Sequence, residues 1–146
     1  MRKRRFIYFS ARCAGILALL AAVLHAVFGT AGMLTGIKVG DIRSSMVLPV
    51  KNVYLFSSVL FLLSAVWILF LAAELRAMRR RAWWQALLLS LGYIGGSLAA
   101  IQLNGLQIQL VGLAFIGLIL LFPLLIFAGS FTNKTVAGME HFRQEK

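Results

Sequence analysis

The sequence predicts an all-α membrane protein in which four transmembrane helices form an up-down-up-down bundle. Three runs without Lys, Arg, Asp or Glu predict it: Cys13–Ile37 with 25 residues, Asn52–Ala73 with 22, and Ala82–Asn133 with 52. A helix crosses the apolar core of a bilayer with about 20 apolar residues. The two shorter runs therefore supply one crossing each, and the long run supplies two crossings and a turn.

Composition points the same way. Of the 146 residues, 61% are hydrophobic and only 13% are charged, and the mean hydropathy of +0.90 exceeds that of water-soluble domains. The net charge of +11 is not a sign of nucleic-acid binding here, because the cations cluster beside the apolar runs. Four crossings use nearly all of the chain, so we expect a single membrane domain over residues 1–146. The lone Cys13 excludes an internal disulfide.

The first crossing is expected over residues 14–35. The stretch Arg2–Phe28 also has features of a cleaved signal peptide, namely a basic start and an apolar middle followed by small residues. An uncleaved helix is favoured because the charge-free run continues to Ile37, beyond the length of a signal-peptide core.

The connection after the first crossing predicts a short interfacial helix. Asp41 is a suitable N-cap, residues 42–48 have the pattern of a short helix, and Pro49 is a stop signal. We expect the apolar side chains of this helix to lie on the outer membrane surface.

Small residues mark expected helix contacts in the later crossings. These crossings are expected over residues 53–75, 86–103 and 108–131. Ser57 and Ser64 are seven residues apart in the second crossing, and Gly92 and Gly96 are four apart in the third. Both spacings place small groups on one helix face, where a neighbouring helix can approach closely. In the fourth crossing, Pro123 predicts a kink.

The distribution of positive charge predicts that both termini face the cytoplasm. Short cytoplasmic flanks of membrane proteins carry an excess of Lys and Arg. The two termini and the connection between the second and third crossings share twelve such residues, whereas the opposite side has only Lys38, Arg43 and Lys51. This bias and the compact chain favour a bacterial cytoplasmic (inner) membrane. The basic face is expected to attract anionic lipid headgroups through Arg4, Arg5, Arg79, Arg80 and Arg81.

His25 is the one ionisable side chain well inside a predicted crossing, and two interpretations remain open. As a functional group it would titrate a proton or bind a ligand. As a structural group it would be a neutral imidazole bonded to a serine or tyrosine of a neighbouring helix. The functional interpretation groups it with polar residues at the outer ends of the helices, lining a path for a ligand or proton: His25, Asp41, Arg43, Gln102, Asn104, Gln107 and Gln109.

Motifs for chemistry are absent from the sequence. It contains no Gly-rich phosphate loop, no Ser/His/Asp set and no Cys/His cluster, so we expect no metal and no cofactor. Glu74 is expected to pair with the neighbouring arginines. We therefore expect a non-catalytic accessory subunit that packs against another membrane protein or a second copy. The alternatives are a small transporter or channel-like oligomer that uses the His25 path, and an enzyme that uses His25 as a base on lipid.

Overall fold

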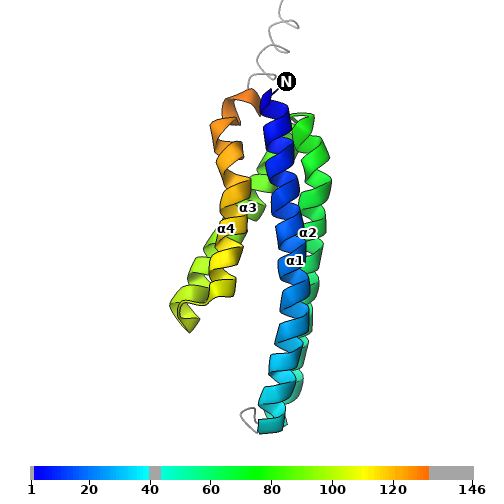
Figure 1. The fold of residues 1–146 in the computed structure, drawn as a ribbon, viewed down its shortest axis with the longest axis vertical. Coiled ribbons are helices and arrows are strands. Elements are labelled where there is room, and N and C mark those ends of the chain that lie inside the picture. The colour runs from blue at the N-terminus through cyan, green and yellow to red at the C-terminus, as the bar shows by residue number, and fades with distance from the viewer. Residues whose placement is uncertain (1, 40–43, 132–146) are drawn as a thin grey trace, which may run out of the picture.

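The computed structural model describes residues 2–39 and 44–131, which fold almost entirely into α-helices (Figure 1). The helices are α1 (Arg2–Val39), α2 (Ser44–Arg76), α3 (Arg80–Asn104) and α4 (Ile108–Ile126), with no strand in the described ranges. All four are long and apolar enough to cross a membrane. This confirms the predicted fold class as an all-α protein with four transmembrane-type helices.

Several helix ends differ from the predicted crossings, including the start of α3 at Arg80 rather than residue 86. α1 starts at Arg2 and not near residue 14, because no Gly or Pro interrupts the basic segment and its charges end the apolar run without ending the helix. α4 ends at Ile126, before the predicted end at residue 131. Pro123 lies in its last turn, and Phe127 adopts a non-helical conformation before the helical turn at residues 128–131.

The short interfacial helix predicted before the second crossing does not form as a separate element, because its residues from Ser44 onward are part of α2. Helix α2 already begins at Ser44 and continues through Pro49 to Arg76, so the prediction that Pro49 stops a helix is wrong. Proline has a helical φ, and in the second turn of a helix it removes only one backbone hydrogen bond. Asp41, the expected N-cap, lies outside the described residues.

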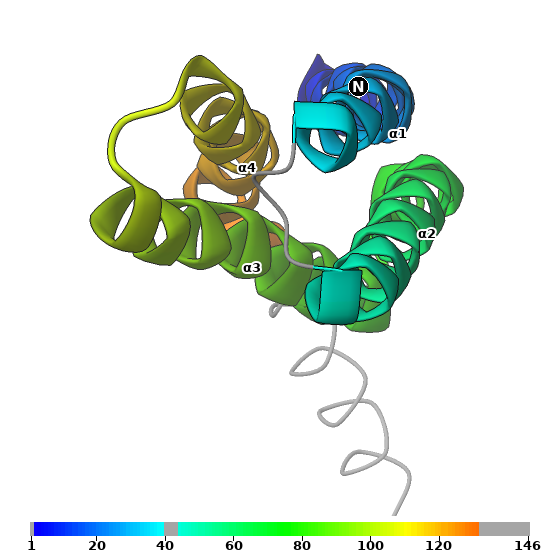
Figure 2. The same cartoon turned by 90° about the horizontal axis from the view of Figure 1, so that it is seen from below.

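The helices form two hairpins, α1–α2 and α3–α4. Helix α1 packs most extensively on α2, and α3 on α4; of the helix pairs that touch, α2 and α3 have the smallest contact. Figure 1 shows the two hairpins together at the end that carries Arg2, with α3 and α4 inclined away from α1 and α2 toward the α3–α4 turn. Figure 2, seen from the opposite end, shows the same divergence.

The α1–α2 contact is a seam of small residues. Ala11, Ala14, Ala18 and Ala22 of α1 are all buried, at spacings of three and four residues that keep them on one helix face. A Cβ added to Gly15 would lie 2.6 Å from the Leu69 Cδ2 atom of α2. The Leu69 backbone nitrogen would lie 3.3 Å from the same Cβ, so the absence of a side chain at Gly15 lets the two helices approach closely, which is the usual packing of helices in membranes.

The turn between α2 and α3 is closed by backbone hydrogen bonds. Arg79 N–H donates to the Glu74 carbonyl at 3.2 Å, and Met78 N–H donates to the Leu75 carbonyl at 2.9 Å. This is the bonding pattern of a Schellman cap, whose central residue is usually glycine. Here it is Met78, with φ +57°, and its buried side chain packs into the core. The hydrophobic contact offsets the cost of a left-handed backbone at a residue with a Cβ.

The end of α4 is held by aromatic residues of α1 and α3. Trp83 Nε1–H donates to the Leu124 carbonyl at 2.9 Å, which satisfies one of the last carbonyl groups of the helix. The Phe6 ring packs edge-on against Phe127, with 6.2 Å between the ring centroids. These contacts place the first turns of α1 and the end of α4 at the same end of the molecule (Figure 1).

Candidate functional site

A row of hydroxyl and aromatic side chains lies along one face of α2. Tyr54, Ser57, Phe61 and Ser64 are spaced three, four and three residues apart, which places them on a single helix face. This face meets His25 of α1 and Tyr93 of α3. We call these six residues the aromatic–hydroxyl row. It is the place where the one ionisable group expected inside a crossing meets its neighbours.

His25 contacts three members of the row. Its ring stacks on Tyr54 with 4.6 Å between centroids, and Phe61 packs edge-on against it at 5.3 Å. Its Nε2 atom lies 3.4 Å from the Ser57 hydroxyl, while the Tyr54 hydroxyl donates to the His25 backbone carbonyl. The close approach of Tyr54 depends on Gly29, because a Cβ at that position would collide with the Tyr54 hydroxyl.

The hydrogen bonds of the Ser57 hydroxyl show whether the His25 imidazole donates or accepts in their contact. The Ser57 hydroxyl donates its one hydrogen to the Tyr54 carbonyl at 2.8 Å, so its oxygen is left to accept. The Nε2 atom of His25 is then the donor in the contact with Ser57, and a neutral ring carries its proton on Nε2. This arrangement matches the structural interpretation of His25, in which the imidazole bonds to a serine of a neighbouring helix.

At the other end of the row, Tyr93 connects α2 to α3. The Tyr93 side chain is buried, and its hydroxyl lies 2.7 Å from the hydroxyl of Ser64. Because Ser64 donates to the Phe61 carbonyl at 2.8 Å, Tyr93 is the donor in this bond. The Phe61 ring lies between the two ends of the row, 6.4 Å from the Tyr93 ring. The row thus joins α1, α2 and α3. It contributes to the contact between α2 and α3, which is the smallest among the helix pairs that touch.

The chemistry available to the row is limited. None of its six members is a carboxylate or a thiol, and its hydroxyl hydrogens go to backbone carbonyls or to one another. Among the residues that the structure describes, no group of three or more His, Cys, Asp or Glu side chains is placed to hold a metal ion. The hydrogen bonds and ring contacts of the row link α1, α2 and α3 to one another.

The structure does not bring the glutamines of the predicted path to His25. Gln102, Gln107 and Gln109 are exposed near the α3–α4 turn. In residues 2–39 and 44–131, no hydrogen bond or ring contact joins any of these glutamines to the His25 side chain. Asn104 is the last residue of α3, and Asp41 and Arg43 lie outside the described residues.

The residues predicted for helix packing divide into two sets. Ser57 and Ser64 lie at helix contacts, Ser57 against His25 of α1 and Ser64 against Tyr93 of α3. Gly92 and Gly96 are exposed on α3, and a Cβ added at either position would meet no atom of the described chain within 4 Å. The close contact between α3 and α4 lies instead at Gly117, where an added Cβ would be 2.8 Å from the Ser90 carbonyl oxygen.

The basic end of the molecule carries one described carboxylate. Glu74 forms an exposed ion pair with Arg79 at 2.9 Å, as the sequence predicts. The other arginines expected to meet anionic lipid, Arg4, Arg5, Arg80 and Arg81, are exposed at the same end. One contact at this end was not predicted from the sequence: Arg12 and Arg76 both lie over the ring of Tyr8. The spacing of Tyr8 and Arg12, four residues apart, is its only sequence signal.

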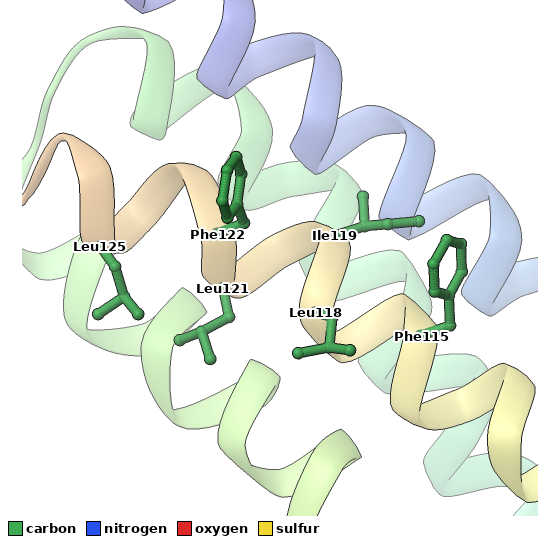
Figure 3. Close-up of a pocket in the computed structure, with 6 residues that line it drawn as sticks. All are labelled: Phe115, Leu118, Ile119, Leu121, Phe122 and Leu125. Atoms are coloured by element: carbon green, nitrogen blue, oxygen red, sulfur yellow. The ribbon is translucent and has the colours of Figure 1, made fainter.

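A hollow of about 460 Å³ runs along α4 (Figure 3) and is lined by no member of the aromatic–hydroxyl row. All its lining residues are apolar: Phe115, Leu118, Ile119, Leu121, Phe122 and Leu125. Polar ligands need a few placed polar groups to fix their orientation, and these six side chains offer none. The hollow suits hydrocarbon, as expected of a helix surface in a membrane.

Comparison with models of known protein families, with curated proteins and with solved structures finds no significant match to this chain.

Proposed function

We propose that this chain is a non-catalytic integral membrane protein that works by packing against another membrane protein, as an accessory subunit of a larger complex. In this proposal the helices cross the bilayer in an up-down-up-down bundle with both termini in the cytoplasm of a bacterial cell. The charge pattern supports the orientation, because the basic segments fall at the end that carries Arg2 and the α2–α3 turn.

The observation that carries the proposal is the outward face of α3. Two sets of residues with seven-residue spacing run along it, and every member is exposed: Gln85, Gly92 and Ala99, and, three positions later, Leu88, Gly95 and Gln102. A row of this kind is the seam that a second helix occupies in coiled-coil packing. We call these six residues the α3 seam.

The α3 seam has the composition of a helix contact in a membrane. At its centre, a Cβ added to Gly92 or Gly95 would meet no atom of the described chain within 4 Å. A glycine has no side chain to pack against lipid tails, whereas it allows the backbone of a partner helix to approach closely. The seam therefore favours a protein partner over lipid.

A transport path is less well supported. The contacts of His25 account for it as a structural group within the helices, and the glutamines of the suggested path lie apart from it. An enzyme that uses His25 as a base is also less well supported. Among the described residues, no carboxylate contacts the imidazole, and the Tyr54 and Ser57 hydroxyl hydrogens are bonded to carbonyl groups.

Bulky side chains on the α3 seam test the proposal. We expect Gly92→Leu with Gly95→Leu to reduce association with the partner about tenfold or more, because leucine side chains hold a second helix away. The fold of the chain should be unaffected, since both positions face open space. The measurement is the amount of membrane protein, including differently tagged copies of this chain, that copurifies in a mild detergent.

Gly112→Leu is the matched control. Gly112 is also an exposed helix glycine with nothing within 4 Å of an added Cβ, but it lies on α4, outside the α3 seam. It should leave copurification unchanged. Equal copurification by the control and the double variant, with both folded, would contradict the proposal.

A further inference from the structure

Tyr8 holds two arginines at the basic end of the α1–α2 seam. The Cζ atom of Arg12, from the next turn of α1, lies 5.2 Å from the centroid of the Tyr8 ring. The Cζ atom of Arg76, from the last turn of α2, lies 5.4 Å from the same centroid. The ring is itself half-buried against the core, so it is a fixed support for both guanidinium groups. We call Tyr8, Arg12 and Arg76 the Tyr8 clamp.

The positive charge of the clamp is not neutralised by the described part of the chain. Within residues 2–39 and 44–131, neither Arg12 nor Arg76 has an ion pair, and Glu74 pairs with Arg79. The attraction between a guanidinium and an aromatic ring is electrostatic, so it does not use up the N–H donors of the arginine. The clamp therefore presents two sets of donors and two positive charges to an anion.

The clamp lies at the depth of lipid headgroups. Arg12 directly precedes the charge-free run Cys13–Ile37, and Arg76 is the third residue after the run Asn52–Ala73. Both runs lie in helices apolar enough to cross a membrane. The two guanidinium groups are thus at the boundary between hydrocarbon and water, where the phosphate of a phospholipid also lies. Phosphate is the anion whose oxygens best match the planar donor fork of arginine.

We infer that the Tyr8 clamp is a binding site for the phosphate group of an anionic phospholipid. The site differs from diffuse attraction between a basic surface and a membrane, because both arginines are held by one ring. It is also independent of the α3 seam, which lies on another helix.

The test compares two pairs of arginines at the same end of the molecule. Arg12→Gln with Arg76→Gln removes the clamp, and Arg80→Gln with Arg81→Gln removes equal charge from exposed residues outside it. Purified full-length protein in neutral detergent is titrated with phosphatidylglycerol, with phosphatidylcholine and with inorganic phosphate, and binding is read from the shift in thermal unfolding. We expect the clamp variant to bind phosphatidylglycerol roughly tenfold more weakly, and the control less than about threefold more weakly.

A second variant separates geometry from charge. Arg12→Lys with Arg76→Lys keeps both charges but loses the planar forks, and we expect it to bind phosphatidylglycerol several-fold more weakly than the native protein. Equal weakening by the clamp and control pairs, or native binding by the lysine variant, would overturn the site. Equal binding of phosphatidylcholine would overturn the selectivity for an anionic lipid. Equal binding of inorganic phosphate would overturn the lipid as the source of the phosphate.

Discussion

Replacing Gly117 with leucine is expected to separate α4 from α3 and to be among the most destabilising substitutions in the chain. A Cβ at this position would lie 2.7 Å from the Ile94 Cγ1 atom and 2.8 Å from the Ser90 carbonyl oxygen. The carbonyl belongs to the α3 backbone and cannot rotate away, so the helices must move apart. Overpacking by one small group costs about 1–3 kcal/mol. We expect a cost in this range for Gly117→Ala and a larger one for Gly117→Leu.

The measurement is the free energy of unfolding in mixed detergent micelles, with Gly112→Leu as the control on the same helix. Gly112 lies about one and a half turns earlier in α4, and nothing lies within 4 Å of a Cβ added there. The control should change the free energy of unfolding by less than about 0.5 kcal/mol. Similar values for Gly112→Leu and Gly117→Leu would show that α3 and α4 do not pack at Gly117.

Truncating Tyr93 to alanine is expected to have the second large effect. The Tyr93 side chain is buried, and it supplies both a hydrogen bond to Ser64 and a ring contact with Phe61. These contacts join α2 and α3, which have the smallest contact of the helix pairs that touch. Loss of a buried aromatic side chain costs about 3–5 kcal/mol. Because the contact also links the two hairpins, we expect the α3–α4 hairpin to become more accessible to proteolysis at its turn.

Two further variants divide this effect into its parts. Tyr93→Phe removes only the hydroxyl group, and interhelical hydrogen bonds in membranes contribute about 0.6 kcal/mol on average, with a maximum near 1.7 kcal/mol. Leu91→Ala on the same helix is the control, because the Leu91 side chain is half exposed. Unfolding in mixed micelles again gives the values. A full-sized loss for Tyr93→Phe, or none for Tyr93→Ala, would contradict the role assigned to the ring and its hydroxyl.

The four helices could be predicted because their signal is length and hydropathy, which are local properties of the sequence. The helix ends were less predictable. Pro49 has the signature of a stop, yet its place in the second turn of α2 makes its cost small. The basic start of α1 lies outside the apolar run, and nothing in a hydropathy pattern says that a helix continues through it.

The candidate site could be predicted only in part. His25 stands out in the sequence because an ionisable residue in an apolar run is rare. Its partners Tyr54 and Phe61 are ordinary in composition, and only the register of α2 against α1 makes them neighbours. The same limit explains why the glycine contacts could not be predicted. Gly92 and Gly96 have a conspicuous spacing but face away from the other helices, whereas the isolated Gly117 lies against α3. Spacing identifies a face of a helix, and packing decides what that face meets.

Cysteine labelling in intact cells most directly tests the proposal that the chain crosses the membrane four times with both termini in the cytoplasm. Cys13 is replaced by serine, and single cysteines are introduced at Ala77 in the α2–α3 turn and at Leu106 in the α3–α4 turn, both exposed positions. A membrane-impermeant maleimide should label Leu106→Cys in intact cells, and Ala77→Cys only after the membrane is permeabilised. Labelling of both cysteines in intact cells, or of Ala77→Cys alone, would contradict the four crossings or their orientation.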